Sequence, residues 1–325
     1  MPAAIGLSPI LSARYRPQDL TRIADAAPGS RLVSVSLEGL ADGDLSDVEV
    51  LLRGPMPQAH FDRLLGRCPS LMWVHSATAG VERVLTPTAL ERGLAITNAR
   101  GVFSDPIAEY VLMMVLAVSR RLPQLLELHR ERTWQPLEGR EMADVTIGVV
   151  GLGSIGRRVA ELSLQFGSRV VAIRRRAGDA ADVPGLSEVL SPERLPELMA
   201  QSDFVVLALP LTPDTTDLFD AQMLAHAKPG AWLINVARGA LVDERALVRA
   251  VRDGQLGGAV LDAFREEPQP ADSELYQTPN IIVTPHTSWS SGRVLDRSIE
   301  LFCDNLGRFA RGEPLFNLVD AGAGY

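Results

Sequence analysis

The sequence predicts an α/β fold built on doubly wound parallel sheets, arranged in two domains. Along the 325 residues, short apolar runs that suit buried strands alternate with segments of helical periodicity. From residue 145 onward these runs are long enough to be central parallel strands, which are buried on both faces. The chain is also longer than one hydrophobic core usually supports, so two domains are expected.

Five short strands are predicted in the first hundred residues of the chain. They are the runs AAIGLS, RLVSVSL, DVEVLLRG, LMWVHS and LAITN. Helical segments are expected between them around residues 17–27 and 57–66. This part of the chain therefore predicts an α/β unit of its own.

A long helix is predicted next, over SDPIAEYVLMMVLAVSRR at residues 104–121. Asp105 is its expected N-cap, and Pro106 suits the first helical position. The segment is apolar nearly all round, and a helix of that kind usually lies between domains or subunits. Another helix is expected near residues 290–311, where it would return to the first domain.

Six longer apolar runs follow residue 145 and predict the strands of a second sheet. The runs are VTIGVVG, RVVAI, DFVVLAL, AWLINV, GGAVLDAF and NIIVTPH. Helical segments separate them, as in a parallel sheet whose strands are joined by crossover helices.

Composition excludes several classes of function. A net charge of -8 and a pI near 5.3, without a basic patch interleaved with aromatic residues, argue against nucleic acid as a partner. Cys68 and Cys303 lie far apart without metal-ligand spacing, so neither a disulfide framework nor a metal site is expected. The longest apolar run, at residues 110–118, is too short to span a bilayer. We expect a soluble cytoplasmic protein without a membrane partner.

The most specific single motif is G-x-G-x-x-G at Gly151, Gly153 and Gly156, directly after a strand and before a helix. The first glycine permits a tight turn, the second lets the backbone approach a pyrophosphate, and the third allows close packing of the helix on the strand. Backbone N–H groups of Ser154 and Ile155 would hold the phosphates at the positive end of the helix. The motif predicts a Rossmann dinucleotide site for NAD or NADP.

Three consecutive arginines, Arg174, Arg175 and Arg176, begin 18 residues after Gly156, at the end of the run RVVAI. In NAD-binding proteins an acidic residue near this place bonds the ribose, whereas an arginine suits the 2′-phosphate of NADP. Because Lys228 is the only lysine, arginine supplies nearly all basic positions, and a solvated face is the alternative reading. The position favours NADP(H) as the preferred cofactor, with NAD(H) possible.

The chain resembles the D-isomer-specific 2-hydroxyacid dehydrogenase family over nearly its whole length. The matching stretches, in family order, are ATAGVE, AEYVLMMVLAVSR, GLGSIGRRVA, LPLTPDTT, INVARGALVDERALVRAV, LDAFREEP and TPHTSW. The resemblance implies a Rossmann NAD(P)-binding domain, residues 101–287, inserted into a smaller flavodoxin-like substrate domain, residues 1–100 plus 288–325. It also implies an active site in the cleft between the domains, and a homodimer built largely on the nucleotide domain.

The family's catalytic trio transfers to Arg238, Glu267 and His286. Arg238, permanently charged, would hold the carboxylate and polarise the carbonyl of a 2-oxo acid. His286 would donate a proton to the carbonyl oxygen as hydride arrives. Glu267 would orient the imidazole and stabilise its charged form. Adjacent Glu266 leaves a one-residue ambiguity that only the resemblance resolves. All three lie where predicted strands end, which is where ligands bind in open parallel sheets.

Other candidate site residues follow from the same resemblance. ATAGVE resembles a loop that holds the substrate carboxylate, with the N–H groups of Ala79 and Gly80 as donors. Asp262 resembles the residue that meets the nicotinamide carboxamide. Further candidates for cofactor contacts within the matching stretches are Pro210, Thr215 and Ala237.

Aromatic and histidine residues near the predicted site are ambiguous. Trp134 and Trp289 could line the substrate pocket, but aromatic residues beside an active site more often serve packing. His75, close to ATAGVE, is more often structural in such a setting. The residues after His286 are bulkier or more polar than the family's usual small pair, which puts the shape of the substrate pocket in question.

The sequence therefore predicts an NAD(P)-dependent dehydrogenase that interconverts a 2-oxo acid and a D-2-hydroxy acid, with glyoxylate or hydroxypyruvate as candidate substrates. A non-catalytic dinucleotide sensor, such as a corepressor, is the main alternative, because the fold also serves such regulators. A third possibility is that the fold acts on another small anion as its substrate, such as formate or phosphite. Turnover of some 2-oxo acid would distinguish the enzyme from the sensor.

Overall fold

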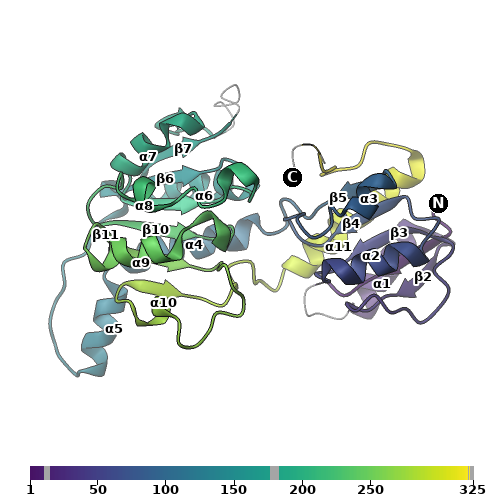
Figure 1. The fold of residues 1–325 in the computed structure, drawn as a ribbon, viewed down its shortest axis with the longest axis horizontal. Helices are drawn as coiled ribbons and strands as arrows, with labels where there is room; N and C mark the ends of the chain where they lie inside the picture. Colours follow the sequence, from purple (N-terminus) through teal and green to yellow (C-terminus); the bar gives the residue numbers. More distant parts are fainter. Residues whose placement is uncertain (11–14, 176–182, 321, 323–325) are drawn as a thin grey trace. The chain divides into compact units, whose positions relative to one another are not determined.

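The computed structural model describes residues 1–10, 15–175, 183–320 and 322 of the chain (Figure 1). The chain divides into two compact units, Met1–Phe103 with Ser291–Tyr325, and Ser104–Ser290. The domain boundaries predicted from the sequence were residues 100/101 and 287/288. The roles predicted for the two domains remain predictions.

The first unit contains a five-stranded sheet in which all neighbouring strands are parallel. The strand order is β2-β1-β3-β4-β5, which is the flavodoxin-like arrangement predicted for this part of the chain. The strands are β1 (Ala4–Leu7), β2 (Arg31–Ser34), β3 (Val48–Arg53), β4 (Trp73–Ser76) and β5 (Ala95–Thr97).

Helices cover both faces of this first sheet. On one face, α1 (Pro17–Ala26) and α11 (Val294–Arg311) bury Ile23 and Phe302 in the same cluster as Trp73 of the sheet. On the other face, α2 (Gln58–Arg67) and α3 (Pro87–Glu91) contribute to a second cluster. The helix predicted near residues 290–311 therefore does return to the first unit.

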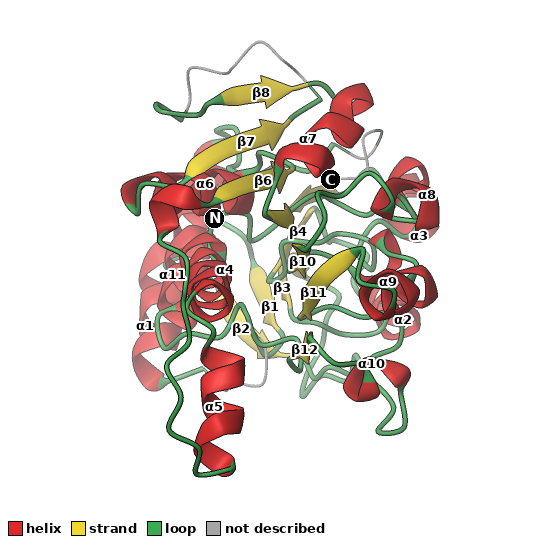
Figure 2. Ribbon diagram, turned by 90° about the vertical axis from the view of Figure 1, so that its left-hand side faces the viewer, coloured by secondary structure: helices red, strands yellow, loops and turns green. Residues whose placement is uncertain are grey.

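The second unit contains a seven-stranded parallel sheet. Its order, β12-β11-β10-β9-β6-β7-β8, reverses direction between β6 and β9, as in a Rossmann fold. The strands are β6 (Thr146–Val150), β7 (Arg169–Ile173), β8 (Glu188–Leu190), β9 (Phe204–Leu207), β10 (Ala231–Asn235), β11 (Leu256–Leu261) and β12 (Ile281–Val283). Six of these were predicted; the short edge strand β8, beside β7 in Figure 2, was not.

Helices and short 3-10 turns connect the strands of the second unit. The helices are α4 (Ser104–Ser119), α5 (Leu122–Arg130), α6 (Ser154–Gln165), α7 (Leu195–Gln201), α8 (Ala221–Leu224), α9 (Glu244–Arg252) and α10 (Glu274–Gln277). The 3-10 turns are η1 (Met142–Asp144), η3 (Pro192–Arg194), η4 (Pro213–Thr215) and η5 (Gly239–Leu241). No helix in the described part of the chain is long and apolar enough to cross a membrane.

The start of α4 differs from the prediction. The helix begins at Ser104, so Asp105 lies in its first turn and is not the N-cap. The Asp105 carboxylate instead accepts a hydrogen bond of 2.8 Å from Nε of Arg158 on α6, against which α4 packs. The Asp105 side chain therefore forms an ion pair with the neighbouring helix and does not cap its own.

Candidate functional site

The glycine-rich turn lies between β6 and α6, at the point where the order of the second sheet reverses. Gly151 adopts a φ of 100°, and a Cβ there would lie 2.7 Å from the carbonyl oxygen of Ala208, just beyond β9. A Cβ on Gly156 would lie 1.9 Å from the carbonyl oxygen of Gly151. Only glycine fits at either position, because the turn and the helix approach neighbouring backbone directly.

Gly153, between these two glycines, is the N-cap of α6 and offers no side chain to cap the helix. A Cβ at Gly153 would meet nothing within 4 Å, so the space beside the turn is open. Ser154 and Ile155 are the first two residues of the helix. An open space beside a helix start without a side-chain cap fits the diphosphate of a dinucleotide.

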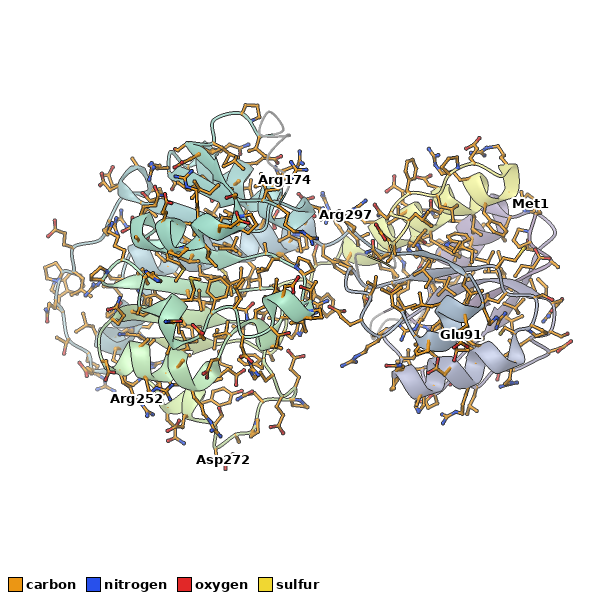
Figure 3. The ribbon with its side chains drawn as sticks, turned by 45° about the horizontal axis from the view of Figure 1, so that its top comes forward. Met1, Glu91, Arg174, Arg252, Asp272 and Arg297 are labelled. Carbon is orange, nitrogen blue, oxygen red and sulfur yellow. The ribbon has the colours of Figure 1, made fainter. Side chains whose placement is uncertain are left out.

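The arginine triplet begins directly after β7. The backbone N–H of Arg174 donates to the carbonyl oxygen of Leu190 on β8, at 3.1 Å. The Arg174 side chain is half-buried and Arg175 is exposed; Figure 3 shows Arg174 at the surface. Arg176 lies outside the described residues. The first two arginines thus stand at the carboxyl end of the second Rossmann strand, where the sequence predicted them.

Arg238 lies in the turn that leaves β10. Its carbonyl oxygen accepts a hydrogen bond of 2.9 Å from Nδ2 of Asn235, and Oδ1 of Asn235 accepts from the backbone N–H of Ala237 at 3.0 Å. Nη1 of Arg238 donates to the carbonyl oxygen of Ala237 at 2.8 Å. The buried Asn235 side chain therefore shapes the turn that presents the guanidinium.

His286 and Glu267 form a hydrogen-bonded pair. Nδ1 of the ring lies 2.9 Å from Oε2 and 3.0 Å from Oε1 of Glu267. A carboxylate only accepts, so Nδ1 carries the proton and Nε2 is left as the ring atom that can exchange a proton with a bound molecule. Oε1 of Glu267 also accepts the backbone N–H of Phe264 at 3.0 Å. Glu267, not the adjacent Glu266, is the carboxylate on the ring.

Asp262 holds the segment that carries His286. Its buried carboxylate accepts the Thr284 hydroxyl at 2.6 Å and the backbone N–H groups of Thr287 and Ser288, both at 2.8 Å. His286 lies inside this segment with a φ of 48°, in the left-handed region that few non-glycine residues adopt. Such conformations persist where surrounding contacts impose them, often at functional sites. Asp262 thus has a structural task besides the cofactor contact that the sequence predicts.

Tyr110 on α4 extends this network. Its hydroxyl lies 2.6 Å from Oγ1 of Thr284. Burial raises the pKa of Tyr110 to about 12, so the hydroxyl keeps its proton at neutral pH. Because the Thr284 hydroxyl donates to Asp262, Tyr110 must be the donor to Thr284. A hydrogen-bond chain therefore runs from α4 to the His286 segment.

The turns that carry Arg238 and Glu267 touch each other. A Cβ on Gly239 would lie 1.9 Å from the carbonyl carbon of Phe264 and 2.3 Å from the nitrogen of Arg265. The backbone after Arg238 therefore packs directly on the peptide that precedes the Glu267 turn. The second unit brings all three predicted catalytic residues to the carboxyl ends of neighbouring strands, β10, β11 and β12.

Two of the predicted cofactor residues bind each other. The Thr215 hydroxyl donates to the carbonyl oxygen of Pro210 at 2.9 Å and accepts the backbone N–H of Thr212 at 2.8 Å. These contacts close the loop after β9 into a compact turn. Within the described residues, no group of three or more His, Cys, Asp or Glu side chains could hold a metal ion.

Ala79 and Gly80 belong to the first unit, just after β4. The carbonyl oxygen of Ala79 accepts Nδ2 of Asn98 at 2.9 Å, and that of Gly80 accepts the Thr78 hydroxyl at 2.8 Å. Both carbonyls are therefore held by the protein, which fixes the orientation of the adjoining peptides.

The ambiguous aromatic and histidine residues have different settings. Trp134 is fully exposed, and Trp289 is half-buried. His75 is fully buried and bonds the Thr97 hydroxyl through Nδ1 at 2.8 Å, and burial lowers its pKa to about 3. The structural interpretation of His75 fits this setting.

Several residues that shape the site were not identified from the sequence. They are Tyr110, Asn235, Gly239 and Thr284. Asn235 and Thr284 gave a usable signal, because each is a polar residue at the end of an apolar strand. Tyr110 gave none, since its partner Thr284 is distant in sequence.

Comparison with known proteins decides the family. Residues 112–288 match the family model described as D-isomer specific 2-hydroxyacid dehydrogenase, NAD binding domain. The chain belongs to this family. The resemblance seen in the motifs is thereby confirmed, and the matched range contains the glycine-rich turn, Arg238, Glu267 and His286.

Members of the 2-hydroxyacid dehydrogenase family match beyond the NAD-binding domain. A glyoxylate reductase of Korarchaeum cryptofilum is 32% identical over 307 residues, which cover 91% of this chain and 88% of that protein. A D-isomer specific 2-hydroxyacid dehydrogenase of Xanthobacter autotrophicus Py2, solved with NADPH and MES, has a TM-score of 0.88 at 32% identity, with 100% of both chains covered.

A second solved structure is an NADPH-dependent glyoxylate/hydroxypyruvate reductase of Sinorhizobium meliloti in complex with NADP and sulfate. It has a TM-score of 0.85 at 28% identity and covers 99% of this chain and 100% of that one. D-3-phosphoglycerate dehydrogenase of Mycobacterium tuberculosis is 36% identical over 263 residues, or 80% of this chain. The chain spans about half the length of that dehydrogenase, 49%.

Proposed function

We propose that the protein is an NADPH-dependent reductase that converts a small 2-oxo acid into a D-2-hydroxy acid, and catalyses the reverse oxidation. The observation that carries the proposal is the His286–Glu267 pair beside the Arg238 turn, at the carboxyl edge of a Rossmann sheet. A fixed cation, an oriented proton donor and a dinucleotide site are what reduction of a carbonyl beside a carboxylate requires.

The three side chains have different tasks in this mechanism. Arg238 binds the substrate carboxylate and polarises the carbonyl oxygen. A dinucleotide held at the glycine-rich turn would supply the hydride that reduces the carbonyl carbon. Nε2 of His286 donates a proton to the carbonyl oxygen, while Glu267 holds Nδ1 and stabilises the charged ring between turnovers. In the first unit, the N–H groups of Ala79 and Gly80 would bind the substrate carboxylate.

The preference for NADPH rests on the position of the arginines. Arg174 and Arg175 stand at the end of β7, where a carboxylate would repel a 2′-phosphate and a guanidinium can bind it bidentately. The related structures solved with NADPH or NADP support the same assignment.

Glyoxylate and hydroxypyruvate are the first candidate substrates. The relatives named as glyoxylate reductase and glyoxylate/hydroxypyruvate reductase match this chain over nearly its full length.

The test is a substrate panel with NADPH and NADH, running from glyoxylate and hydroxypyruvate to branched and aromatic 2-oxo acids. We expect turnover of the small acids with NADPH. His286→Ala and Arg238→Ala should each lower kcat by at least about 100-fold, because each removes a group that acts on the reacting oxygen. Both variants should retain affinity for NADPH. Cofactor binding without turnover of any acid would instead favour the sensor.

We further propose that the protein acts as a homodimer in the cytoplasm. An open apolar groove of about 400 Å³ on the second unit is lined mainly by Met113, Met114, Leu122 and Leu126 of α4 and α5. The extended segment that follows α5 carries the fully exposed Trp134. Exposed apolar side chains gathered on two adjacent helices are typical of a protein interface, and a second copy of the chain is the partner that the family resemblance implies. Both cysteines are free thiols, as a reducing compartment would keep them.

A further inference from the structure

Arg265 is held at both its backbone and its side chain, two residues before Glu267. Its backbone N–H donates to Oε1 of Glu244 at 2.9 Å. Its guanidinium donates to the carbonyl oxygen of Val242, from Nε at 3.1 Å and from Nη2 at 3.0 Å, and pairs with the Asp217 carboxylate. A residue on the turn after β11 is therefore tied to two other segments of the second unit.

Those two segments are themselves joined by backbone hydrogen bonds. The N–H of Asp217 donates to the carbonyl oxygen of Ala240 at 2.9 Å, and the N–H of Phe219 donates to that of Leu241 at 3.0 Å. Glu244 is the first residue of α9, and burial raises the pKa of its carboxyl, with the nearby Asp243 and Glu266 adding to the effect. Arg265 is thus anchored on a continuous edge of hydrogen-bonded backbone.

The anchored residue borders the turn that carries Glu267. The Phe264–Arg265 peptide packs on Gly239 on one side, and the Phe264 N–H bonds the Glu267 carboxylate on the other. Fixing Arg265 therefore fixes the backbone from which Glu267 reaches His286. The Glu267 side chain is itself 39% exposed, so solvent competes for its carboxylate unless the turn holds it in place.

We infer that Arg265 is a positioning residue, which acts through the Glu267 turn to hold the carboxylate on Nδ1 of His286. Its consequence for turnover rests on the proposed function, whereas the alignment of Glu267 and His286 does not. Arg265 would touch neither substrate nor cofactor in this role.

The direction in which the titration midpoint of the His286 ring shifts separates this role from a general charge effect. Removing a nearby cation favours protonation of an imidazole, and so raises the midpoint of its titration. Loss of the Glu267 contact disfavours the protonated ring, and so lowers the midpoint. The other charged groups around the turn, Glu244, Asp217 and Glu266, stay in place in the variants below.

The experiment follows the ring resonances of His286 by NMR as a function of pH in the full-length protein, with His286→Gln used to assign the signal. In Glu267→Gln the midpoint should fall. In Arg265→Met it should fall in the same direction. Arg265→Lys keeps the charge but not the planar fork. Its midpoint should lie between those of wild type and Arg265→Met. Adding Arg265→Met to Glu267→Gln should not lower the midpoint any further, since the two act through one contact.

Arg252→Met is the matched control. Arg252 ends α9 in the same unit, is exposed to a similar degree at 46% against 39%, and pairs with Glu274. Figure 3 shows it at the surface. Its replacement should leave the midpoint where it is in wild type.

Four outcomes bear on the inference. A midpoint in Arg265→Met that rises or does not move, in protein with native circular dichroism, overturns it. If Arg265→Met does not fold, the shift in Arg265→Lys decides by the same criterion. A midpoint that falls supports the positioning role, and kcat with a 2-oxo acid should then fall by about 3- to 10-fold with an unchanged KM for NADPH. A fallen midpoint without any turnover in wild type would refute the proposed function and leave the positioning role standing.

Discussion

At the scale of single residues, the site depends on side chains whose polar atoms are already hydrogen-bonded to neighbouring groups. Glu267 occupies Nδ1 of His286, so the ring presents Nε2. The Asp262 carboxylate accepts hydrogen bonds from the Thr284 hydroxyl and from the backbone after His286. These hydrogen bonds therefore hold the ring in a fixed orientation and leave Nε2 as the ring atom that can exchange a proton.

Cofactor choice is also decided at this scale. Arg174→Asp places a carboxylate at the end of β7, where it repels a 2′-phosphate and accepts ribose hydroxyls. We expect the ratio of kcat/KM for NADPH to that for NADH to fall by about 10- to 100-fold, as the loss of one charge-assisted hydrogen bond allows. Steady-state kinetics with both cofactors measure the ratio.

Arg252→Asp is the control. Arg252 lies at the end of α9, far from β7 in the sequence, and its replacement should leave the cofactor ratio unchanged. A wild-type protein that favours NADH, or an Arg174→Asp variant with an unaltered ratio, would mean that the arginines only form a solvated face.

At the scale of elements, the opposite end of the second sheet depends on one buried carboxylate. Asp203 precedes β9 and bonds Arg140 at 3.0 Å, Lys228 at 2.7 Å and the backbone N–H of Thr146 at 2.8 Å. Burial by itself would raise the pKa of Asp203, but the hydrogen bonds from Arg140, Lys228 and Thr146 outweigh it, and the pKa is lowered. Asp203 thereby joins β6 and β9 to the segments that carry the two cations.

Asp203→Asn should therefore lower the free energy of unfolding at pH 7 by about 1 to 2 kcal/mol. A depressed pKa contributes stability above the unfolded value, 3.8, and loses it as the pH falls through the lower folded value. The difference between variant and wild type should thus shrink in acid. Urea unfolding at pH 7 and at successively lower pH measures it.

Asp272→Asn, at an exposed loop position, is the control and should match wild type throughout. A difference for Asp203→Asn that stays constant down to the lowest pH at which the fold persists would argue against a charge-based contribution.

At the scale of the whole molecule, the exposed apolar side chains of the second unit predict assembly. Met113, Leu122, Leu125 and Leu126 of α4 and α5 are each at least 40% exposed. A stable dimer buries at least about 1,200 Å² in total, and aliphatic side chains on two adjacent helices are suited to the core of such an interface.

Leu126→Glu should convert the proposed dimer into monomers, because it places a charge in the apolar groove. Sedimentation velocity of the purified protein measures the change. Leu90→Glu, on α3 of the first unit, changes a leucine that is 45% exposed, against 47% for Leu126, and should leave the dimer intact. A monomeric wild-type protein would refute the proposed assembly.

The sequence by itself determined the α/β class, six of the seven strands of the second sheet and the glycine-rich turn, and it placed Arg238, Glu267 and His286 at predicted strand ends, whereas their choice as a trio came from the family resemblance. These features are local. A run of apolar residues, a glycine required by a tight turn, or a polar residue at a strand end can be recognised without knowing what lies beside it.

Only the tertiary structure decided which side chains complete the site. The short edge strand β8 forms because β7 offers an open edge. Asp105 binds Arg158 because α4 packs on α6, so its acidic side chain does not cap the helix. Tyr110 reaches Thr284, and Arg265 reaches Asp217, only after strands distant in sequence have paired. Such hydrogen bonds join residues that no local pattern relates, because their geometry exists only once the sheet has formed.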